Sequence, residues 1–491
     1  MTDRQTSGSH AAGVLLPGFA GTTLPDWLAE RLRLGLAGVC LFAENIVSGD
    51  QVRRLTDQIR QANPLALIAI DEEGGDVTRL FAATGSPYPG NAILGRIDDL
   101  DYTEAVASSV GWQLRRASCT LDFAPDVDIN SNPDNPVIGV RSFGTDPALV
   151  ARHSAAWVRG LESTGIASSV KHFPGHGDTA QDSHVALPVV DLSLDELRER
   201  ELVPFRAAIE AGASTIMTSH IVLPQVDQEG PATFSRRILG DLLRGELGFA
   251  GLIVTDALDM AGASAEIGIP AAAVRAVDAG CDLLCIGTRN TAEQLDSIER
   301  ALLDAISDGS LSAARLEDAG VRNHDLARVL DQRSSLIPIP EYVGELDEQF
   351  DLERTTGAFD VRPGVTVSAD RAVVVLETAS NIAVGRSLWG VVAAGADPVV
   401  QRRGDALDLP PGVQPVLVGK NNHRHPWVRE TIDAVRASHP SAIVVDMGWA
   451  GDDRAYADVA TFGGSRHAGR ALLAWLETRA ADTGAAETGR P

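Results

Sequence analysis

The chain has 491 residues, 44% of them hydrophobic and 22% charged, a composition typical of soluble globular proteins. This length exceeds what one hydrophobic core usually serves, so we expect two domains. The formal net charge of −25, from 42 basic and 67 acidic residues, argues against nucleic-acid and anionic-membrane partners, which bind basic surfaces.

Short runs rich in Val, Ile and Leu recur along the first part of the chain and predict eight buried strands, at 13–17, 38–42, 66–70, 120–124, 167–172, 214–219, 251–255 and 282–287. Stretches with helical periodicity lie between them, among them 102–116, 149–162, 194–211 and 235–246. Buried strands that alternate with amphipathic helices predict a parallel sheet covered by helices. Eight such units predict an α/β fold of the (β/α)8 TIM-barrel type, and a doubly wound open sheet is the alternative.

Five of these runs end in ionisable residues at the same, carboxyl, end. The residues are Asp71, Asp126 with Asp128, Lys171 with His172, His220 and Asp256. In a barrel these strand ends open on one mouth, which is where active sites of this fold lie. The sequence therefore predicts an active site built from the strand ends.

The pattern changes after the eighth run. Two prolines and a mixed segment over 337–345 indicate a linker. Further on, buried strands are expected at 372–377, 414–419 and 441–446, and helices at 427–437 and 466–477. We therefore predict a TIM-barrel catalytic domain over 1–335, a linker over 336–364 and a smaller α/β sandwich domain over 365–491.

The stretch 171–184 concentrates chemically useful side chains: three histidines, two aspartates and a lysine among Gly and Pro. The whole chain has only two lysines, Lys171 and Lys420, against forty arginines. Lysine is a compact point donor whereas arginine is a planar fork. A site that needs one small ammonium beside a sugar or phosphate oxygen would explain Lys171, and a salt-bridged loop lysine is the alternative.

Three further residues have the chemistry of catalytic groups. Asp256 ends a buried strand between apolar neighbours, where an unpaired carboxylate is costly. It is either an N-cap of the next helix or a nucleophile that can attack an anomeric carbon. Asp182 and His184, two residues apart, can form a carboxylate–imidazole pair whose histidine donates and then withdraws a proton. A loop held by local hydrogen bonds is the alternative.

The acidic loop 71–79 and one isolated arginine offer polar groups for a ligand. Asp71 can accept from sugar hydroxyls and Arg79 can reach the same pocket, while a solvated acidic loop is the alternative. Arg141 is a weaker candidate, since a loop arginine is more often a surface residue. A zinc site is another interpretation, with His172, His176, Asp178 and His184 as ligands. Their spacing matches no established ligand signature, so we expect no metal.

Together these segments resemble glycoside hydrolase family 3, and within it the N-acetyl-β-D-glucosaminidase branch. The matching segments occur in the family's order, at 17–19, 71–79, 123–128, 135–144, 171–184 and 255–256. The resemblance is close over 10–330 and weaker over 365–480. It departs from the family's pattern at Asp76, where relatives often carry a basic or larger polar residue.

The resemblance implies a retaining double-displacement mechanism. It makes Asp256 the nucleophile, His184 the acid/base peculiar to this branch and Asp182 its partner. The implied sugar-binding residues are Asp71, Arg79, Arg141, Lys171 and His172. The expected activity is exo-acting hydrolysis of terminal β-linked N-acetylglucosamine, without a cofactor, on fragments of cell wall or chitin. A phosphorylase that uses inorganic phosphate and a non-catalytic carbohydrate-binding barrel are the alternatives.

The cysteines and the N-terminus bear on the compartment. Four cysteines lie inside apolar runs without metal-ligand spacing, which favours buried free thiols: Cys40, Cys119, Cys281 and Cys285. The first ten residues lack the pattern of a secretory signal, and no apolar run reaches the roughly 18 residues of a membrane span. We expect a cytoplasmic protein whose partner is a small carbohydrate.

Overall fold

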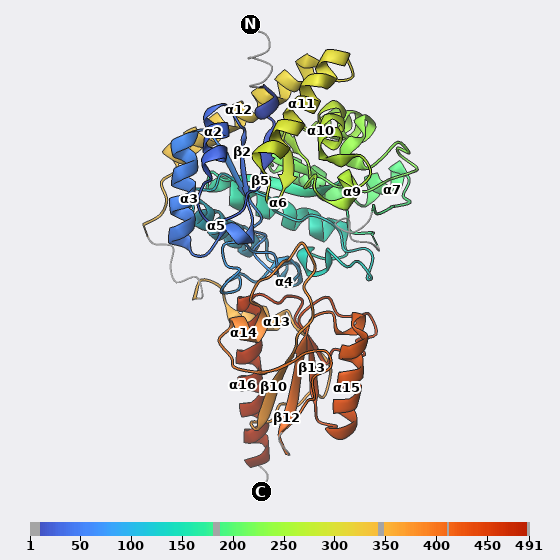
Figure 1. The fold of residues 1–491 in the computed structure, drawn as a ribbon. Helices are drawn as coiled ribbons and strands as arrows, with labels where there is room; N and C mark the ends of the chain where they lie inside the picture. Colours follow the sequence, from blue (N-terminus) through green and yellow to red (C-terminus); the bar gives the residue numbers. More distant parts are fainter. Residues whose placement is uncertain (1–9, 180–186, 342–347, 410–411, 489–491) are drawn as a thin grey trace. The chain divides into compact units, whose positions relative to one another are not determined.

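The computed structural model describes residues 10–179, 187–341, 348–409 and 412–488 (Figure 1). The chain divides into two compact units. The first consists of Met1–Glu73, Leu100–Ile138 and Thr145–Val343, and the second of Gly74–Asp99, Gly139–Gly144 and Gly344–Pro491. Two short segments from early in the chain thus belong to the second unit. The predicted domain limits of 1–335, 336–364 and 365–491 stay a prediction.

Within the described residues, the first unit has eight main strands: β1 (Leu15–Pro17), β2 (Gly38–Leu41), β3 (Leu67–Ile70), β4 (Leu121–Asp122), β5 (Ala167–Phe173), β6 (Thr215–Thr218), β7 (Leu252–Val254) and β8 (Leu284–Gly287). Strands β2 to β7 form a parallel sheet in chain order, and β1 pairs with β8. A parallel bridge between Val254 and Leu283 joins β7 to the segment that leads into β8. The Ala37 amide donates to the Ala12 carbonyl at 3.2 Å and links β2 to the start of β1. The predicted barrel is confirmed, and the open-sheet alternative is wrong.

Helices follow the strands of this barrel, as the sequence predicts: α2 (Asp26–Arg33), α3 (Gly49–Ala62), α5 (Leu100–Arg116), α6 (Pro147–Ser163), α7 (Leu194–Glu199), α8 (Leu202–Glu210), η4 (Arg237–Glu246), α9 (Ala261–Ser264), α10 (Gly268–Ala279), α11 (Ala292–Asp308) and α12 (Ala313–Leu336). The single helix expected over 194–211 is two helices, because the backbone of Arg200 leaves the helical region at the end of α7. Ser193 begins α7 with a capping box that includes Glu196.

Apolar side chains from the strands fill the interior of the barrel. Leu16, Phe123 and Met217 belong to one buried cluster, which also includes Ala327 and Leu330 of α12. Burying a side chain of this size contributes roughly 1.5–3 kcal/mol. This packed interior fixes the strand ends, and with them the polar residues that follow each strand.

The second unit contains a six-stranded sheet in the order β11-β10-β12-β13-β14-β9, all parallel except β9. The strands are β9 (Asp360–Val361), β10 (Arg371–Leu376), β11 (Val399–Gln401), β12 (Gln414–Gly419), β13 (Ile443–Asp446) and β14 (Val459–Ala460). Its helices are α4 (Asn91–Ile97), α13 (Leu352–Gly357), α14 (Gly390–Ala393), α15 (Pro426–Ser438) and α16 (Arg466–Thr488).

Helices cover both faces of this second sheet. Alternate residues of a strand face opposite sides, so Val375 belongs to one core cluster and Val374 to another. The first cluster includes Leu472 of α16, and the second includes Ile432 of α15. Figure 1 shows α15 and α16 on opposite sides of β10, β12 and β13. The predicted α/β sandwich is confirmed.

The thiols agree with the sequence analysis. All four cysteines are buried and free. Burial raises the pKa of the Cys119 and Cys281 thiols, which keeps them protonated and unreactive. In the part of the chain that the structure describes, no helix has both the length and the apolar content that a membrane span requires.

Candidate active site

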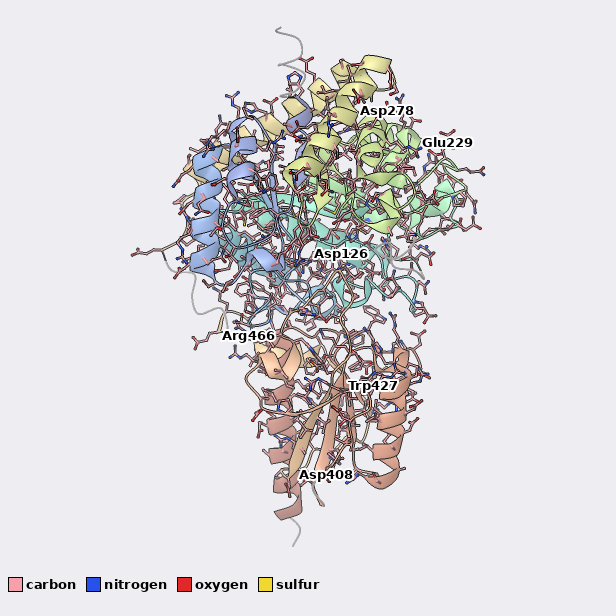
Figure 2. The ribbon with its side chains drawn as sticks, viewed as in Figure 1. Asp126, Glu229, Asp278, Asp408, Trp427 and Arg466 are labelled. Atoms are coloured by element: carbon pink, nitrogen blue, oxygen red, sulfur yellow. The ribbon has the colours of Figure 1, made fainter. Side chains whose placement is uncertain are left out.

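Polar residues gather at the carboxyl ends of β3, β4, β5 and β7 in the first unit, where the sequence predicts them. Figure 2 draws the side chains and labels Asp126, which follows β4. The pairing of β5 with β6 is irregular between Val170 and Phe173. Such irregularities re-aim side chains at the ends of strands. Lys171 and His172 lie at this irregularity, and both contact carboxylates from neighbouring strand ends.

Lys171 is 2% exposed and holds two carboxylates together. Its Nζ lies 2.7 Å from Asp71 Oδ1 and 2.8 Å from Glu73 Oε1. A buried ammonium is tolerated only with such partners. Lys171 is salt-bridged, as in the alternative interpretation, but it lies in β5 rather than in a loop, and its role in binding a ligand stays a prediction. Because the Asp71 side chain remains 17% exposed, it is the member of this group that a ligand can reach.

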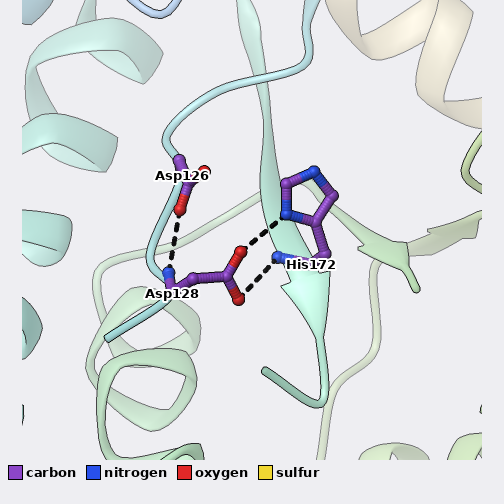
Figure 3. Close-up of side chains that lie close together, drawn as sticks. All are labelled: Asp126, Asp128 and His172. Atoms are coloured by element: carbon purple, nitrogen blue, oxygen red, sulfur yellow. Dashed lines mark hydrogen bonds and ion pairs between the residues drawn. The ribbon is translucent and has the colours of Figure 1, made fainter. Parts of the chain in front are cut away.

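Asp128 organises the residues around His172 (Figure 3). Its Oδ2 lies 2.7 Å from His172 Nδ1, and its Oδ1 accepts from the backbone amides of His172 at 3.3 Å and His176 at 2.6 Å. The amide of Asp128 itself donates to Asp126 Oδ1 at 3.0 Å. A carboxylate beside Nδ1 places the proton of a neutral imidazole on that nitrogen. The Nε2 atom of His172 is then an acceptor.

His176 packs against His172 edge to face, with 5.8 Å between the ring centroids. The pKa of His176 is lowered to about 4. Burial is the main cause, and the neighbouring His172 is the second. The negative charges of Asp128 and Asp256 oppose this shift. His176 is therefore neutral at physiological pH, and its Nδ1 lies 2.9 Å from Thr179 Oγ1. Its role in this arrangement is structural.

Asp256 follows β7 and is half-buried. Its Oδ1 accepts from the Ala257 amide at 2.7 Å. The N-cap interpretation of Asp256 is wrong, because the next helix, α9, is preceded by Met260 and has no side-chain cap. His220 Nε2 lies 3.1 Å from the Ala257 carbonyl, and its Nδ1 lies 2.9 Å from Thr233 Oγ1. These contacts fix the backbone immediately after the Asp256 carboxylate.

The geometry favours a different metal-ligand set from the one that the sequence suggests. Ligand atoms of Asp126, Asp128 and His172 lie within 4.8 Å of one another. Two of the suggested zinc ligands make other contacts, since Asp178 pairs with Arg200 and His176 Nδ1 contacts Thr179. The Nδ1 atom of His172 already shares a hydrogen bond with Asp128.

A buried glutamate that sequence reasoning missed lies under the segment after β5. Glu201 is 2% exposed, and its Oε1 accepts from Arg200 Nε at 2.6 Å. Arg200 also contacts Asp178 at 2.5 Å. Gly175, with φ of +128°, approaches Glu201 so closely that an added Cβ would meet it at 2.8 Å. Burial is the main cause that raises the pKa of Glu201 to about 7. The only sequence signal for it is its place in an apolar helical stretch.

The remaining predicted residues lie in other parts of the chain. Arg79 and Arg141 belong to the second unit. The guanidinium of Arg79 donates to the carbonyls of Ala383 at 2.8 Å and Val384 at 3.2 Å. Arg141 is buried at the end of η2 (Gly139–Arg141), where its carbonyl accepts from the side chain of Asn91 in α4 at 2.6 Å.

The proposed acid/base pair lies outside the described residues. Asp182 and His184 both fall within 180–186, so the distance from either of them to Asp256 stays a prediction. The structure does bring together Asp71, Lys171 and His172 in the first unit, through the contacts with Glu73 and Asp128.

Comparison with known proteins assigns the chain to a family. Residues 23–326 match the Glycosyl hydrolase family 3 N terminal domain. The chain belongs to glycosyl hydrolase family 3. The matched region includes β2 to β8 and all the strand ends described above. The resemblance that the motifs predict is confirmed.

Individual relatives extend this family match. The chain is 39% identical to a beta-hexosaminidase of Stenotrophomonas maltophilia over 335 residues, which cover 63% of this chain and 97% of that one. The chain is also 39% identical to beta-hexosaminidase A of Pseudoalteromonas piscicida. The matched region covers 65% of this chain and 58% of that longer protein. A family 3 β-N-acetylglucosaminidase from a Paenibacillus strain has a similar structure, with a TM-score of 0.82, 30% identity and 96% of both chains covered.

Proposed function

We propose that this family 3 protein is a retaining, exo-acting β-N-acetylglucosaminidase that removes terminal β-linked N-acetylglucosamine. The names of its relatives, beta-hexosaminidases and a β-N-acetylglucosaminidase, support this substrate class. The observation that carries the proposal is the half-buried Asp256 carboxylate at the end of β7, in the same unit as the paired cluster around Lys171. A carboxylate at this position of a barrel is suited to act as a nucleophile.

In the first step Asp256 attacks the anomeric carbon and forms a covalent glycosyl-enzyme while the leaving-group oxygen is protonated. The contacts of Ala257 with Asp256 Oδ1 and with His220 hold the nucleophile in place. A nucleophile that is already held in position loses little further entropy when it reacts. In the second step water attacks the same carbon, so the anomeric configuration is retained.

His184 supplies and then removes the proton, and Asp182 orients its imidazole. The support for this role is the sequence motif and the chemistry of a carboxylate–histidine pair. Proton transfer by a positioned group is worth roughly 10²–10⁴-fold in rate. The segment that leads to His184 begins with Asp178, which Arg200 ties to the buried Glu201.

Asp71, Lys171 and His172 bind the hydroxyl groups of the sugar, and Arg79 and Arg141 complete this set. The partly exposed carboxylate of Asp71 can accept from a sugar hydroxyl beside its contact with Lys171. Lys171 offsets the charge of Asp71 and Glu73, so the pocket does not carry two uncompensated negative charges. The contact of Asp128 with Nδ1 makes the Nε2 side of the His172 ring the one that accepts from the sugar.

The four free buried thiols suit a reducing compartment, and we place the protein in the cytoplasm on that basis. Its substrate there would be a small soluble glycoside. Fragments of bacterial cell wall and of chitin both present terminal N-acetylglucosamine, and both are substrates to compare.

The test is hydrolysis of a chromogenic β-N-acetylglucosaminide, followed by proton NMR of the first product. The proposal predicts that the β-anomer of N-acetylglucosamine appears before mutarotation, in the presence or absence of inorganic phosphate. Formation of N-acetylglucosamine 1-phosphate as the main product in phosphate buffer would instead identify a phosphorylase. Absence of turnover on every β-N-acetylglucosaminide would favour a carbohydrate-binding barrel.

A further inference from the structure

An ion pair in the second unit anchors the loop that carries Arg79. The Lys420 ammonium lies 2.6 Å from Asp76 Oδ2, and the Gly464 amide donates to Asp76 Oδ1 at 2.7 Å. The Asp76 side chain is 5% exposed and that of Lys420 is 17% exposed. Both carboxylate oxygens of Asp76 are therefore held by groups from the C-terminal part of the chain. Asp76, the residue that departs from the family's pattern, thus has Lys420 as the partner of its negative charge.

The surroundings of Lys420 fit this ammonium closely. Its Nζ lies 4.8 Å from the centroid of the Trp389 ring, a cation–π distance. A Cβ added to Gly464 would lie 2.2 Å from Lys420 Cε, so the site has no room for a larger residue. Lys420 directly follows β12, and Gly464 lies shortly before α16. The anchor is therefore attached to the central sheet of the sandwich.

The two lysines of the chain share one feature. Lys171 pairs with Asp71 and Glu73, and Lys420 pairs with Asp76, so both neutralise carboxylates of the stretch 71–76. This stretch crosses from the first unit to the second at Gly74. All other cations of the chain, apart from histidine, are arginines. Both carboxylate contacts are thus made by a compact ammonium rather than by a planar guanidinium.

Arg79 lies at one end of the short segment 76–79, which is held by contacts at both of its ends. Asp76 anchors one end, Val77 and Thr78 are buried, and the Arg79 guanidinium donates to the Ala383 and Val384 carbonyls at the other end. Every one of these anchoring groups belongs to the second unit. The position of Arg79 therefore depends on residues more than 300 positions further along the chain.

We propose that Asp76 and Lys420 are positioning residues for substrate binding: they fix the loop that presents Arg79 to the sugar. This inference rests on the proposed function, because it assigns Arg79 to the sugar. An arginine that is held in advance loses less side-chain entropy when it binds, so loss of the anchor weakens binding more than it slows turnover.

The test is a double-mutant cycle on KM for a chromogenic β-N-acetylglucosaminide. KM does not depend on the fraction of folded enzyme, so a partly unfolded variant still reports on binding. We expect Asp76→Asn and Lys420→Met each to raise KM about 10-fold or more, with a smaller change in kcat. In an Arg79→Ala background, Asp76→Asn should raise KM by no more than about 2-fold, because the positioned group is already absent.

The matched control is Asp458→Asn. Asp458 also accepts from an arginine, Arg436 at 3.1 Å, and from a backbone amide, Val444 at 2.8 Å, within the same unit. This variant should leave KM unchanged. Wild-type KM in both Asp76→Asn and Lys420→Met, or full additivity with Arg79→Ala, would overturn the positioning role alone. A wild-type protein that neither hydrolyses nor binds N-acetylglucosaminides would overturn the proposed function as well.

Discussion

Replacing Asp128 by asparagine tests how the carboxylate controls His172. The substitution keeps the shape of the side chain but turns one of two accepting oxygens into a donor. Those oxygens accept from the His172 and His176 amides and from His172 Nδ1. The new amide group cannot face the two backbone donors, so it must face Nδ1. The imidazole then carries its proton on Nε2, and the acceptor offered to the sugar becomes a donor.

The size of the effect follows from the bond that is lost. That bond joins a sugar hydroxyl to His172 Nε2, and leaving its partner unpaired costs about 1–3 kcal/mol, which corresponds to a loss of roughly 5- to 150-fold in kcat/KM. Both backbone amides keep their acceptor, so the free energy of unfolding should fall by only about 1 kcal/mol. Asp134→Asn, at an exposed position of the loop after β4, is the control and should behave as wild type.

The assay is steady-state hydrolysis of a chromogenic β-N-acetylglucosaminide, with urea unfolding of each variant measured in parallel. An unchanged kcat/KM in folded Asp128→Asn would refute the reasoning about the tautomer of His172. A loss of activity that simply followed a loss of folded protein would refute it too, since the account predicts a folded but impaired enzyme.

Three further predictions concern charge, pH and metal. Lys171→Arg should lower the free energy of unfolding by about 1–3 kcal/mol, because it overpacks a buried site; wild-type stability in urea would show that the site has room for a guanidinium. The pKa of Glu201 is raised from 4.5 to about 7, so its folded form keeps a proton that the unfolded chain releases. The resulting stability is complete below pH 4.5 and is lost as the pH rises through 7. Urea unfolding should therefore show wild type losing about 3 kcal/mol relative to Glu201→Gln between pH 4.5 and 8, whereas a pH-independent difference would contradict the raised pKa. Dialysis against EDTA should leave turnover of the chromogenic substrate unchanged, and its loss with recovery on adding zinc would point to an ion at Asp126, Asp128 and His172.

The barrel and its strand ends were predictable because their signals are local. A buried parallel strand is a continuous apolar run, and a polar residue directly after it, such as Asp71 or Asp256, is readable in one dimension. Strands β9 and β11 escape prediction because they are partly exposed and form no continuous apolar run, and β14 is a two-residue strand between Asp458 and Thr461. The break between α7 and α8 was missed for a related reason, since the apolar period continues through Arg200.

The partners of the site residues could not be predicted. Nothing in the sequence joins Lys420 to Asp76, which lie 344 positions apart, or Asp128 to His172 across two strands. The sequence marked Lys171 and Lys420 as unusual through composition, but only the fold shows that each neutralises part of one acidic stretch. The membership of Arg79 in the second unit is likewise a property of packing.

In the proposed mechanism Asp256 forms a covalent bond to the sugar. The most direct measurement is mass spectrometry of peptides from enzyme incubated with a 5-fluoro N-acetylglucosaminyl fluoride, which slows release of the glycosyl-enzyme. We expect a sugar adduct on the peptide that contains Asp256, and no adduct in the Asp256→Asn variant. An adduct on a different carboxylate, or turnover of the reagent by Asp256→Asn at the wild-type rate, would contradict it.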